Sequence, residues 1–256
     1  MTPMMGVSSA PPARQAMTDA NHTLTIIVPV YNEEDNLARV GEELSAYLGR
    51  TQTDATVLFV NDGSTDRSGE LIEALCAANP RFRFLHLQRN EGLSTALKAG
   101  LDHVVAPYAG YIDSDLQTSP EDFDALMAFA ADHDLVTGVR VNRRDGLVKN
   151  ASSRIANAIR RSITHDGVSD TGCPLKVIRT DVARRIPFFK GMHRFLPALV
   201  LLQGGRVKEV PVRHFPRVAG KSKYHLWNRL VGPAADLLAF RWMRSRTIRY
   251  QVAKQG

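Results

Sequence analysis

Two carboxylates stand one residue apart in the stretch Asp113-Ser114-Asp115-Leu116-Gln117. The apolar run before it, residues 108–112, predicts a buried strand, and Thr118-Ser119-Pro120 after it is typical of the start of a helix. Carboxylates at the end of a strand leave room for a hard cation such as Mg²⁺ or Mn²⁺, which completes its shell with water and phosphate oxygens. The alternative for an isolated Asp-x-Asp is an acidic turn that only caps a helix. The neighbouring motifs decide between the two.

Two further polar motifs follow apolar, β-branched runs earlier in the chain. Tyr31-Asn32-Glu33 follows residues 24–30, and Asp62-Gly63-Ser64 follows residues 56–60. Runs of this composition are typical of strands that are buried on both faces. Asn32 is a candidate cap for the helix that begins after it. Asp62 suits a sugar hydroxyl or a base edge, although it could equally close an Asx turn.

The segments around these motifs alternate between helical and strand patterns. Apolar residues recur at helical spacing in three segments, residues 37–48, 71–75 and 92–105. Further strands are expected at residues 82–87, 134–137 and 206–212. This alternation predicts an α/β fold with a mostly parallel central sheet and helices on both faces. Such sheets bind ligands at the carboxyl ends of their strands, so we expect the three polar motifs to meet at that edge.

The sequence also disfavours several classes of protein. No Gly-x-Gly-x-x-Gly and no P-loop pattern follows the first expected strand, which argues against a dehydrogenase or a P-loop enzyme. Two distant cysteines give no metal spacing and no disulfide framework, so a reducing compartment is expected. No stretch approaches the ~20 apolar residues of a membrane-spanning helix. The net charge of +7, with Arg and Lys concentrated after residue 140, indicates an anionic partner.

The ordered set of motifs resembles the family 2 glycosyltransferases, which have the GT-A fold. The resemblance begins with residues 28–34, 60–66 and 113–117. The later segments 139–145, 172–176, 209–214 and 220–224 resemble the polyprenyl-phosphate branch of that family, which includes dolichol-phosphate mannose synthases and transferases acting on undecaprenyl phosphate. In all, the resemblance covers residues 23–229. Each motif is weak alone, but the ordered set is specific.

The resemblance implies a nucleotide-sugar donor, a divalent Mg²⁺ or Mn²⁺ ion and a role for each matching residue. It implies that Pro29, Tyr31, Glu33 and Asp62 hold the nucleotide. It implies further that Asp113, Ser114 and Asp115 contact the donor sugar and the metal-bound diphosphate, with Gln117 near the metal. Residues 91–95 depart from the family pattern, which leaves the donor sugar open; a UDP donor is favoured over a GDP donor by resemblance.

The basic second half of the chain is expected to handle the acceptor. By resemblance, Arg140, Arg144 and Arg154 form a clamp for the acceptor phosphate, a task that suits the two-pronged guanidinium group. The loop at residues 214–224 would close over the diphosphate and supply Arg217 and Lys221 as catalytic cations. The alternative for these residues is a solvated basic surface. A phosphate monoester is largely dianionic at neutral pH because its second pKa is ~6, so no general base is expected and one displacement inverts the sugar.

The expected domains are a disordered tail at residues 1–22, a GT-A catalytic domain at 23–224 and amphipathic helices at 225–256. The last segment combines Trp227 and Trp242 with several arginines, which suits a helix lying in an anionic membrane surface. Packing of these helices on the domain is the alternative. We therefore expect a peripheral protein on the cytoplasmic face of the inner or plasma membrane, with a membrane-embedded partner left open.

Two other readings of the motifs remain. A transferase to a hydroxyl acceptor, such as a polysaccharide or a protein, would need an acidic base, for which Asp145 or Asp170 are candidates. A non-catalytic module that binds nucleic acid or lipid would use the basic surface alone. The retained acidic motifs argue against that module, because carboxylates without a metal repel phosphate. No nucleic-acid partner is therefore expected.

Overall fold

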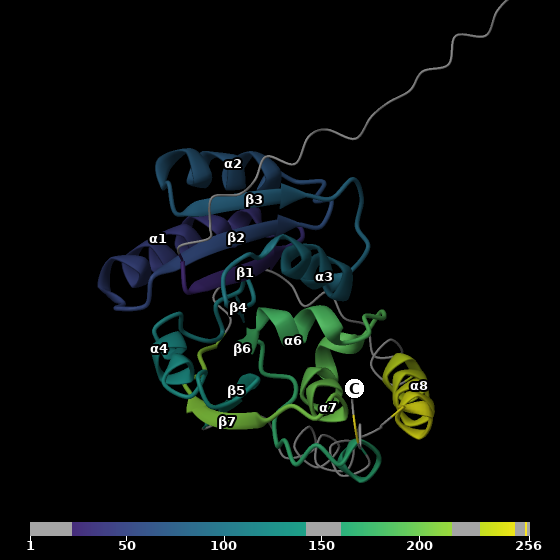
Figure 1. The fold of residues 1–256 in the computed structure, drawn as a ribbon. Coiled ribbons are helices and arrows are strands. Elements are labelled where there is room, and N and C mark those ends of the chain that lie inside the picture. Colours follow the sequence, from purple (N-terminus) through teal and green to yellow (C-terminus); the bar gives the residue numbers. More distant parts are fainter. Residues whose placement is uncertain (1–21, 142–159, 217–230, 249–253, 255–256) are drawn as a thin grey trace, which may run out of the picture.

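The computed structural model describes residues 22–141, 160–216, 231–248 and 254 of the chain (Figure 1). Its first half repeats the expected strand–helix alternation, and its second half is less regular. In chain order the elements are β1 (Leu24–Val30), α1 (Glu34–Arg50), β2 (Ala55–Asn61), α2 (Ser68–Ala78), β3 (Phe82–His86), α3 (Leu93–His103), β4 (Tyr108–Tyr111), α4 (Asp122–Met127), β5 (Leu135–Arg140), β6 (Lys176–Arg179), α6 (Thr180–Arg185), the 3₁₀ helix η2 (Met192–Arg194), α7 (Leu196–Leu202), β7 (Val207–Val212) and α8 (Val231–Arg246).

The strands form one seven-stranded sheet in the order β3-β2-β1-β4-β6-β5-β7. The four strands of the first half are parallel, and β5 is parallel to β7. Among the strands that the structure describes, only β6 runs antiparallel, to both of its neighbours β4 and β5. The predicted mostly parallel sheet is therefore confirmed. Strand β6, which was not predicted, inserts between β4 and β5.

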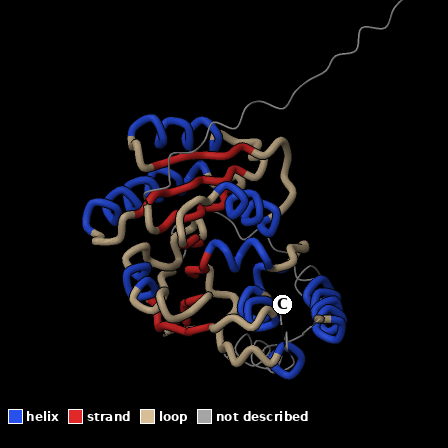
Figure 2. Tube along the Cα trace, in the orientation of Figure 1, coloured by secondary structure: helices blue, strands red, loops and turns tan. Residues whose placement is uncertain are grey.

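Helices cover both faces of the sheet, as predicted (Figure 2). One apolar core lies between the sheet and α1, α2 and α4, and the other lies between the sheet and α3, α6, α7 and α8. Strands β1 and β2 are buried along their whole length, which explains their continuous β-branched composition. In β1, Ile26 and Val28 face the first core while Ile27 faces the second, the alternation that a strand imposes.

Two local expectations differ from the structure. Asn32 does not cap α1, because its backbone adopts a left-handed conformation with φ of +50° and its side chain accepts a hydrogen bond from the Thr65 amide at 2.8 Å. The helix begins at Glu34 instead, and Glu33 at its N-cap makes no side-chain capping bond. The fifth strand is longer than the expected residues 134–137 and extends through Arg140. This extension places Arg140 at the carboxyl end of β5, at the same edge as the polar motifs.

The last helix, α8, shows both buried and exposed apolar side chains. Phe240 is 1% exposed and stacks on Phe195 with ring centroids 5.8 Å apart. Leu238 and Trp242 are 66% and 63% exposed. Arg244 donates to the carbonyl of Ile163 at 2.9 Å, a second contact that ties the helix to the domain. None of the helices within the described residues is long and apolar enough to cross a membrane.

Candidate functional site

The carboxylate pair lies in a tight turn directly after β4. The Leu116 amide donates to the Asp113 carbonyl, and the Gln117 amide donates to the Asp115 side chain, both at 3.2 Å. Leu116 has φ of +46°, an unusual conformation for a residue with a bulky side chain, and it is held in place by burial. From α1, Arg39 donates to the Asp115 carbonyl at 2.7 Å. The turn therefore has a defined shape that fixes where its two carboxylates project.

The carboxylates of Asp113 and Asp115 form an anionic pair that a cation would relieve. Burial and, after it, the charge of Asp115 raise the pKa of Asp113, which is about 6. The Tyr111 hydroxyl, which donates to Asp113 at 2.6 Å, and the positive charges of Lys176 and Arg140 act in the opposite direction. Two close carboxylates resist ionising together unless a positive charge lies between them or beside them.

These residues fit a divalent cation of the Mg²⁺ or Mn²⁺ type. Oxygen ligands from Asp113, Asp115 and the side-chain carbonyl of Gln117 suit hard cations, which keep water or phosphate oxygens as further ligands. The described residues contain no cluster of three or more His, Cys, Asp and Glu side chains that would hold a metal by themselves. A Mg²⁺-type ion at this turn would take further ligands from water or substrate phosphate, as such ions ordinarily do.

The two earlier motifs lie at the same sheet edge and are bonded to each other. The Asn32 amide donates to Ser64 at 3.0 Å, and the Glu33 amide donates to Ser68 at 2.9 Å. Pro29 pairs in register with Val60 inside the sheet. An open cleft of about 600 Å³ adjoins these turns, lined by Tyr31, residues 63–66 and residues 86–90. The sheet topology thus brings to one edge the residues to which the resemblance assigned the nucleotide.

Asp62 has a structural task in addition to any contact with a ligand. It is 3% exposed, and its carboxylate accepts hydrogen bonds from the amides of Glu91 and Gly92 at 2.9 and 2.8 Å and from the Asn90 side chain at 3.0 Å. Gly63 after it has φ of +64°, and a Cβ there would lie 2.3 Å from the backbone of Arg89. Asp62 and Gly63 together fix the turn that starts α3.

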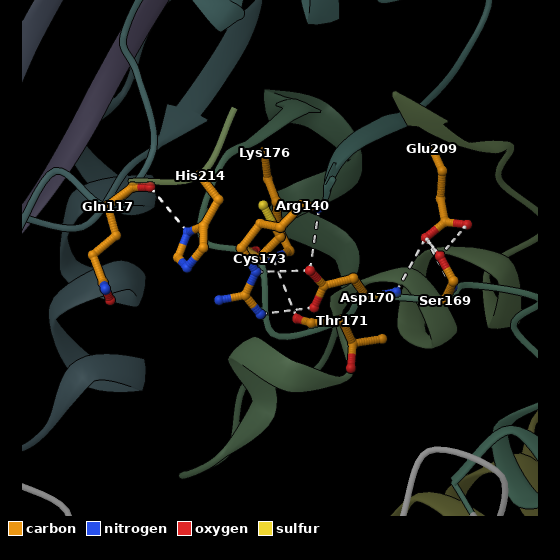
Figure 3. Close-up of polar contacts among 9 residues, drawn as sticks. All are labelled: Gln117, Arg140, Ser169, Asp170, Thr171, Cys173, Lys176, Glu209 and His214. Carbon is orange, nitrogen blue, oxygen red and sulfur yellow. Dashed lines mark hydrogen bonds and ion pairs between the residues drawn. The ribbon is translucent and has the colours of Figure 1, made fainter. Parts of the chain in front are cut away.

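Arg140 and Lys176 form a cationic cluster near Asp113, and Figure 3 shows the residues that hold them. Arg140 binds Asp170 with two parallel hydrogen bonds of 2.7 and 2.8 Å, and both side chains are 13% exposed. Lys176, at the start of β6, is buried and donates to the carbonyls of Thr171 and Cys173. Burial lowers the pKa of Lys176, which the surrounding negative charges partly offset. These contacts hold two cations near Asp113.

The contact with Asp170 changes the expectation for two residues. Arg140 was expected to grip the acceptor phosphate, but the edge of its guanidinium formed by Nε and Nη2 is occupied by Asp170. Asp170 was a candidate base for a hydroxyl acceptor, but it is the ion-pair partner of that arginine. Asp145 and four predicted catalytic residues, Arg144, Arg154, Arg217 and Lys221, lie outside the described residues.

The segment after β7 reaches the carboxylate turn from the second half of the chain. The Phe215 amide donates to the Gln117 carbonyl at 2.9 Å, and the His214 ring lies 3.1 Å from the same oxygen (Figure 3). Further residues that the sequence analysis gave no role, His193 and Arg194, line a pocket of about 230 Å³ beside Asp113. The signal for His214 was present, because the motif of residues 209–214 was noted, but nothing in it indicated which turn it would contact.

Comparison with known proteins gives matches across most of the chain. The family model "Glycosyl transferase family 2" matches residues 25–187. An undecaprenyl-phosphate 4-deoxy-4-formamido-L-arabinose transferase from Edwardsiella ictaluri is 32% identical over 218 residues, which are 84% of this chain and 66% of that protein. The chain thus spans about two thirds of the length of this relative.

Two solved structures share the fold at low sequence identity. A mannosyltransferase from Pyrobaculum calidifontis, in complex with GDP-mannose and Mn²⁺, superposes with a TM-score of 0.64 at 18% identity and covers 90% of this chain and 66% of that one. A glucosyl-3-phosphoglycerate synthase from Mycobacterium tuberculosis, in complex with Mn²⁺, UDP-glucose and phosphoglyceric acid, gives 0.66 at 16% identity and covers 90% and 82%. These likenesses establish the architecture.

Proposed function

The chain belongs to glycosyl transferase family 2, and we propose that it moves a sugar from a UDP-linked donor to the phosphate of a polyprenyl lipid of the undecaprenyl type. The observation that carries the proposal is the carboxylate pair of Asp113 and Asp115 at the strand ends, with the cations Lys176 and Arg140 close to Asp113. An anionic metal site next to a cationic cluster suits two phosphate-bearing substrates. The relative from E. ictaluri, whose name specifies undecaprenyl phosphate, supports this choice of acceptor.

The donor would be held at the edge formed by the first half of the sheet. Tyr31, which lines the open cleft, would hold the nucleotide together with Glu33 and Asp62, and Asp113, Ser114 and Asp115 would contact the diphosphate and sugar. A bound Mg²⁺ or Mn²⁺ would stabilise the negative charge that develops on the departing nucleoside diphosphate. Solved neighbours of the same fold are complexed with Mn²⁺ or Mg²⁺, which supports the choice of ion.

The acceptor side needs positive charge more than it needs a base. A phosphate monoester is already a nucleophilic dianion near pH 7, because its second pKa is ~6. Arg140 would orient the attacking phosphate through the part of its guanidinium that Asp170 does not occupy, with Arg144, Arg154, Arg217 and Lys221 as further proposed cations. A single in-line displacement inverts the anomeric centre. A hydroxyl acceptor is less well supported, because the described candidate base, Asp170, is ion-paired with Arg140.

We place the protein at the cytoplasmic surface of a membrane, where a polyprenyl phosphate presents its head group. Leu238 and Trp242 project from α8 next to Arg241, and these exposed apolar and basic side chains suit an anionic interface. Each basic residue close to such a surface contributes on the order of 1 kcal/mol. Both cysteines are free thiols, in keeping with a reducing compartment.

The test is transfer of labelled sugar from a panel of UDP- and GDP-sugars to undecaprenyl phosphate in the presence of Mg²⁺ or Mn²⁺. We expect a lipid-linked product that is lost with a chelator and in Asp115→Ala. Asp102→Ala, which removes an exposed carboxylate on α3, is the matched control and should keep full activity. Donor hydrolysis without a lipid product would contradict the acceptor, and absence of any donor turnover would contradict the reaction class.

A further inference from the structure

The pocket beside Asp113, called here the Asp113 pocket, is lined in part by residues that have no role in the proposed reaction. It has a volume of about 230 Å³ and is lined by Leu93, Tyr111, Asp113, residues 171–174, Lys176, His193 and Arg194. This is smaller than the ~300–1,000 Å³ that drug-sized ligands occupy. The nucleotide side has its own open cleft of about 600 Å³ at another part of the edge. The Asp113 pocket is therefore of a size for one sugar unit and too small for the whole donor.

His193 is held in this wall by Ser94, in the first turn of α3. The Ser94 hydroxyl accepts a hydrogen bond from the Gly191 amide at 3.0 Å and lies 2.9 Å from Nδ1 of His193. Ser94 is 8% exposed, and its hydroxyl proton has no other acceptor within the described part of the chain than that ring nitrogen. When Ser94 donates this proton, Nδ1 accepts it and Nε2 on the far side of the ring carries the ring proton.

The ring also remains uncharged. Burial, together with the positive charges of Arg194 and Lys176, lowers the pKa of His193 to about 3. A neutral imidazole with its proton on Nε2 is a hydrogen-bond donor of fixed direction. Its state does not change over the pH range in which cells live, because that range lies far above its pKa.

The hydrogen bond to Ser94 also connects the His193 ring to the residues on the nucleotide side. Asp62 accepts from the amide of Gly92, which is the N-cap of α3, and Ser94 is the second residue of that helix. The contacts run without a break from Asp62 through the start of α3 to Ser94 and His193. A substrate that spans the sheet edge from the cleft to the pocket would therefore contact side chains whose positions are fixed by the same helix start, that of α3.

We propose that His193 is a specificity-determining residue for the donor sugar: its Nε2–H donates to an oxygen substituent of the sugar in the Asp113 pocket. Asp113, across the pocket, accepts from a hydroxyl of the same ring, and Arg194 adds a second donor to the wall. This inference rests on the proposed function, since it requires a nucleotide-sugar donor. A site that hydrogen-bonds a substituent rejects analogues that lack it, because its own polar group is then left unpaired.

The test compares binding of UDP with binding of UDP-sugars in Mn²⁺ without acceptor, by isothermal titration calorimetry. The probes are UDP, UDP-glucose, UDP-galactose, UDP-xylose, UDP-N-acetylglucosamine and UDP-glucuronic acid, and the tightest sugar is used for the variants. His193→Phe keeps a ring but has no N–H donor. His193→Asn keeps a polar atom near the position of Nδ1, next to Ser94, but has none near the position of Nε2. His193→Gln keeps an N–H close to the position of Nε2.

For His193→Phe and His193→Asn we expect about tenfold weaker binding of the UDP-sugar, the effect of losing one hydrogen bond to a buried partner. UDP itself should bind within twofold of wild type, and His193→Gln should recover most of the lost affinity. His103→Phe, at the exposed end of α3, is the matched control and should change neither ligand. Melting temperatures of all variants report any general loss of structure.

Equal weakening of UDP and UDP-sugar would show that His193 only supports the fold near α3 and would overturn the proposal. So would unchanged binding of the sugar in His193→Phe, or a His193→Gln variant no better than His193→Asn. Failure of the wild type to bind either UDP or any UDP-sugar would instead refute the UDP-linked donor of the proposed function, on which the proposal rests. The two failures are distinguished by the wild-type titration.

Discussion

The two halves of the sheet place their polar side chains in different ways. In the first half, strands β1 to β4 are parallel, and the polar turns after β1 and β2 each bond to the segment that follows the next strand, as Asn32 bonds to Thr65 and Asp62 to Gly92. In the second half, β6 runs antiparallel between β4 and β5, and the key contacts join segments with no repeated pattern, as Arg140 joins Asp170.

This difference explains why one half can be interpreted from sequence and the other cannot. A repeated strand–turn–helix unit puts every motif at the same edge, so the position of a motif in the chain predicts its place in the fold. An antiparallel insertion breaks that rule. The placement of Lys176, His193 and His214 then depends on long-range packing that no local pattern records.

The largest difference between the halves should be in how much their ion pairs contribute to the free energy of unfolding. Asp170→Asn leaves Arg140 in a largely buried place without its charge partner, and we expect a loss of about 3 kcal/mol in the free energy of unfolding. The matched change in the first half, Asp102→Asn, breaks an exposed pair with Lys98 on α3 and should cost less than about 0.5 kcal/mol. Urea unfolding measures both. Equal costs would show that the second half does not depend on its buried pair.

A smaller change, this time an increase in the free energy of unfolding, is expected for Asp113→Asn in metal-free protein. Asp113 lies at the junction of the two halves. Asp113 has a raised pKa of about 6, so the folded state holds its proton more tightly than the unfolded state, and charging it destabilises the fold. Removing that charge should add about 1–3 kcal/mol to the free energy of unfolding at pH 7.5.

The pH dependence provides the check on this prediction. The increase in the free energy of unfolding of Asp113→Asn over wild type should be complete above pH 6. It should shrink as the pH falls from 6 towards the ordinary pKa of an aspartate, because the wild-type carboxyl is then neutral too. Urea unfolding in chelator across this range measures it. A destabilised Asp113→Asn at pH 7.5 would mean that Lys176 and Arg140 from the second half already neutralise the carboxylate.

The smallest effect concerns the surfaces of the two halves. Replacing Leu238 and Trp242 of α8 together by Ser should weaken binding to vesicles of anionic phospholipid about tenfold, because exposed apolar area no longer enters the interface. Val105→Ser, which changes an exposed apolar residue after α3, should leave binding unchanged. Co-sedimentation with the vesicles measures both. Equal effects, or none in the double variant, would remove α8 from the membrane contact.

The part of the fold that was predictable is the part with strong periodicity. The buried runs of β1 and β2 and the apolar stripe of α1 predicted the parallel sheet and the meeting of Tyr31, Asp62 and Asp113 at its edge. The four-residue strand β6 has no such pattern, since it begins with a lysine and ends with an arginine. Its position between β4 and β5 is fixed by pairing with both, which a short segment does not reveal by itself.

The candidate site was predictable to the same extent. The carboxylate turn was recognisable because two Asp residues follow an apolar run. The partner of Arg140 was not, because a basic segment offers many acids and the sequence does not say which one is near. The expectation that Asn32 caps α1 was wrong. The Asn32 side chain accepts from the Thr65 amide of the next turn, and the Asn32 backbone has φ of +50°. His193 gave no signal, since its role depends on Ser94 and Gly191.

We infer that the carboxylate turn of the first half holds a metal-dependent nucleotide site. The most direct test of this inference is calorimetric titration of UDP into wild type, Asp115→Ala and the control Asp102→Ala, with Mn²⁺ and with chelator. We predict that UDP binds wild type and Asp102→Ala only with Mn²⁺, and that Asp115→Ala loses this metal-dependent binding. Binding of UDP that is equally tight in chelator, or that survives intact in Asp115→Ala, would contradict the claim.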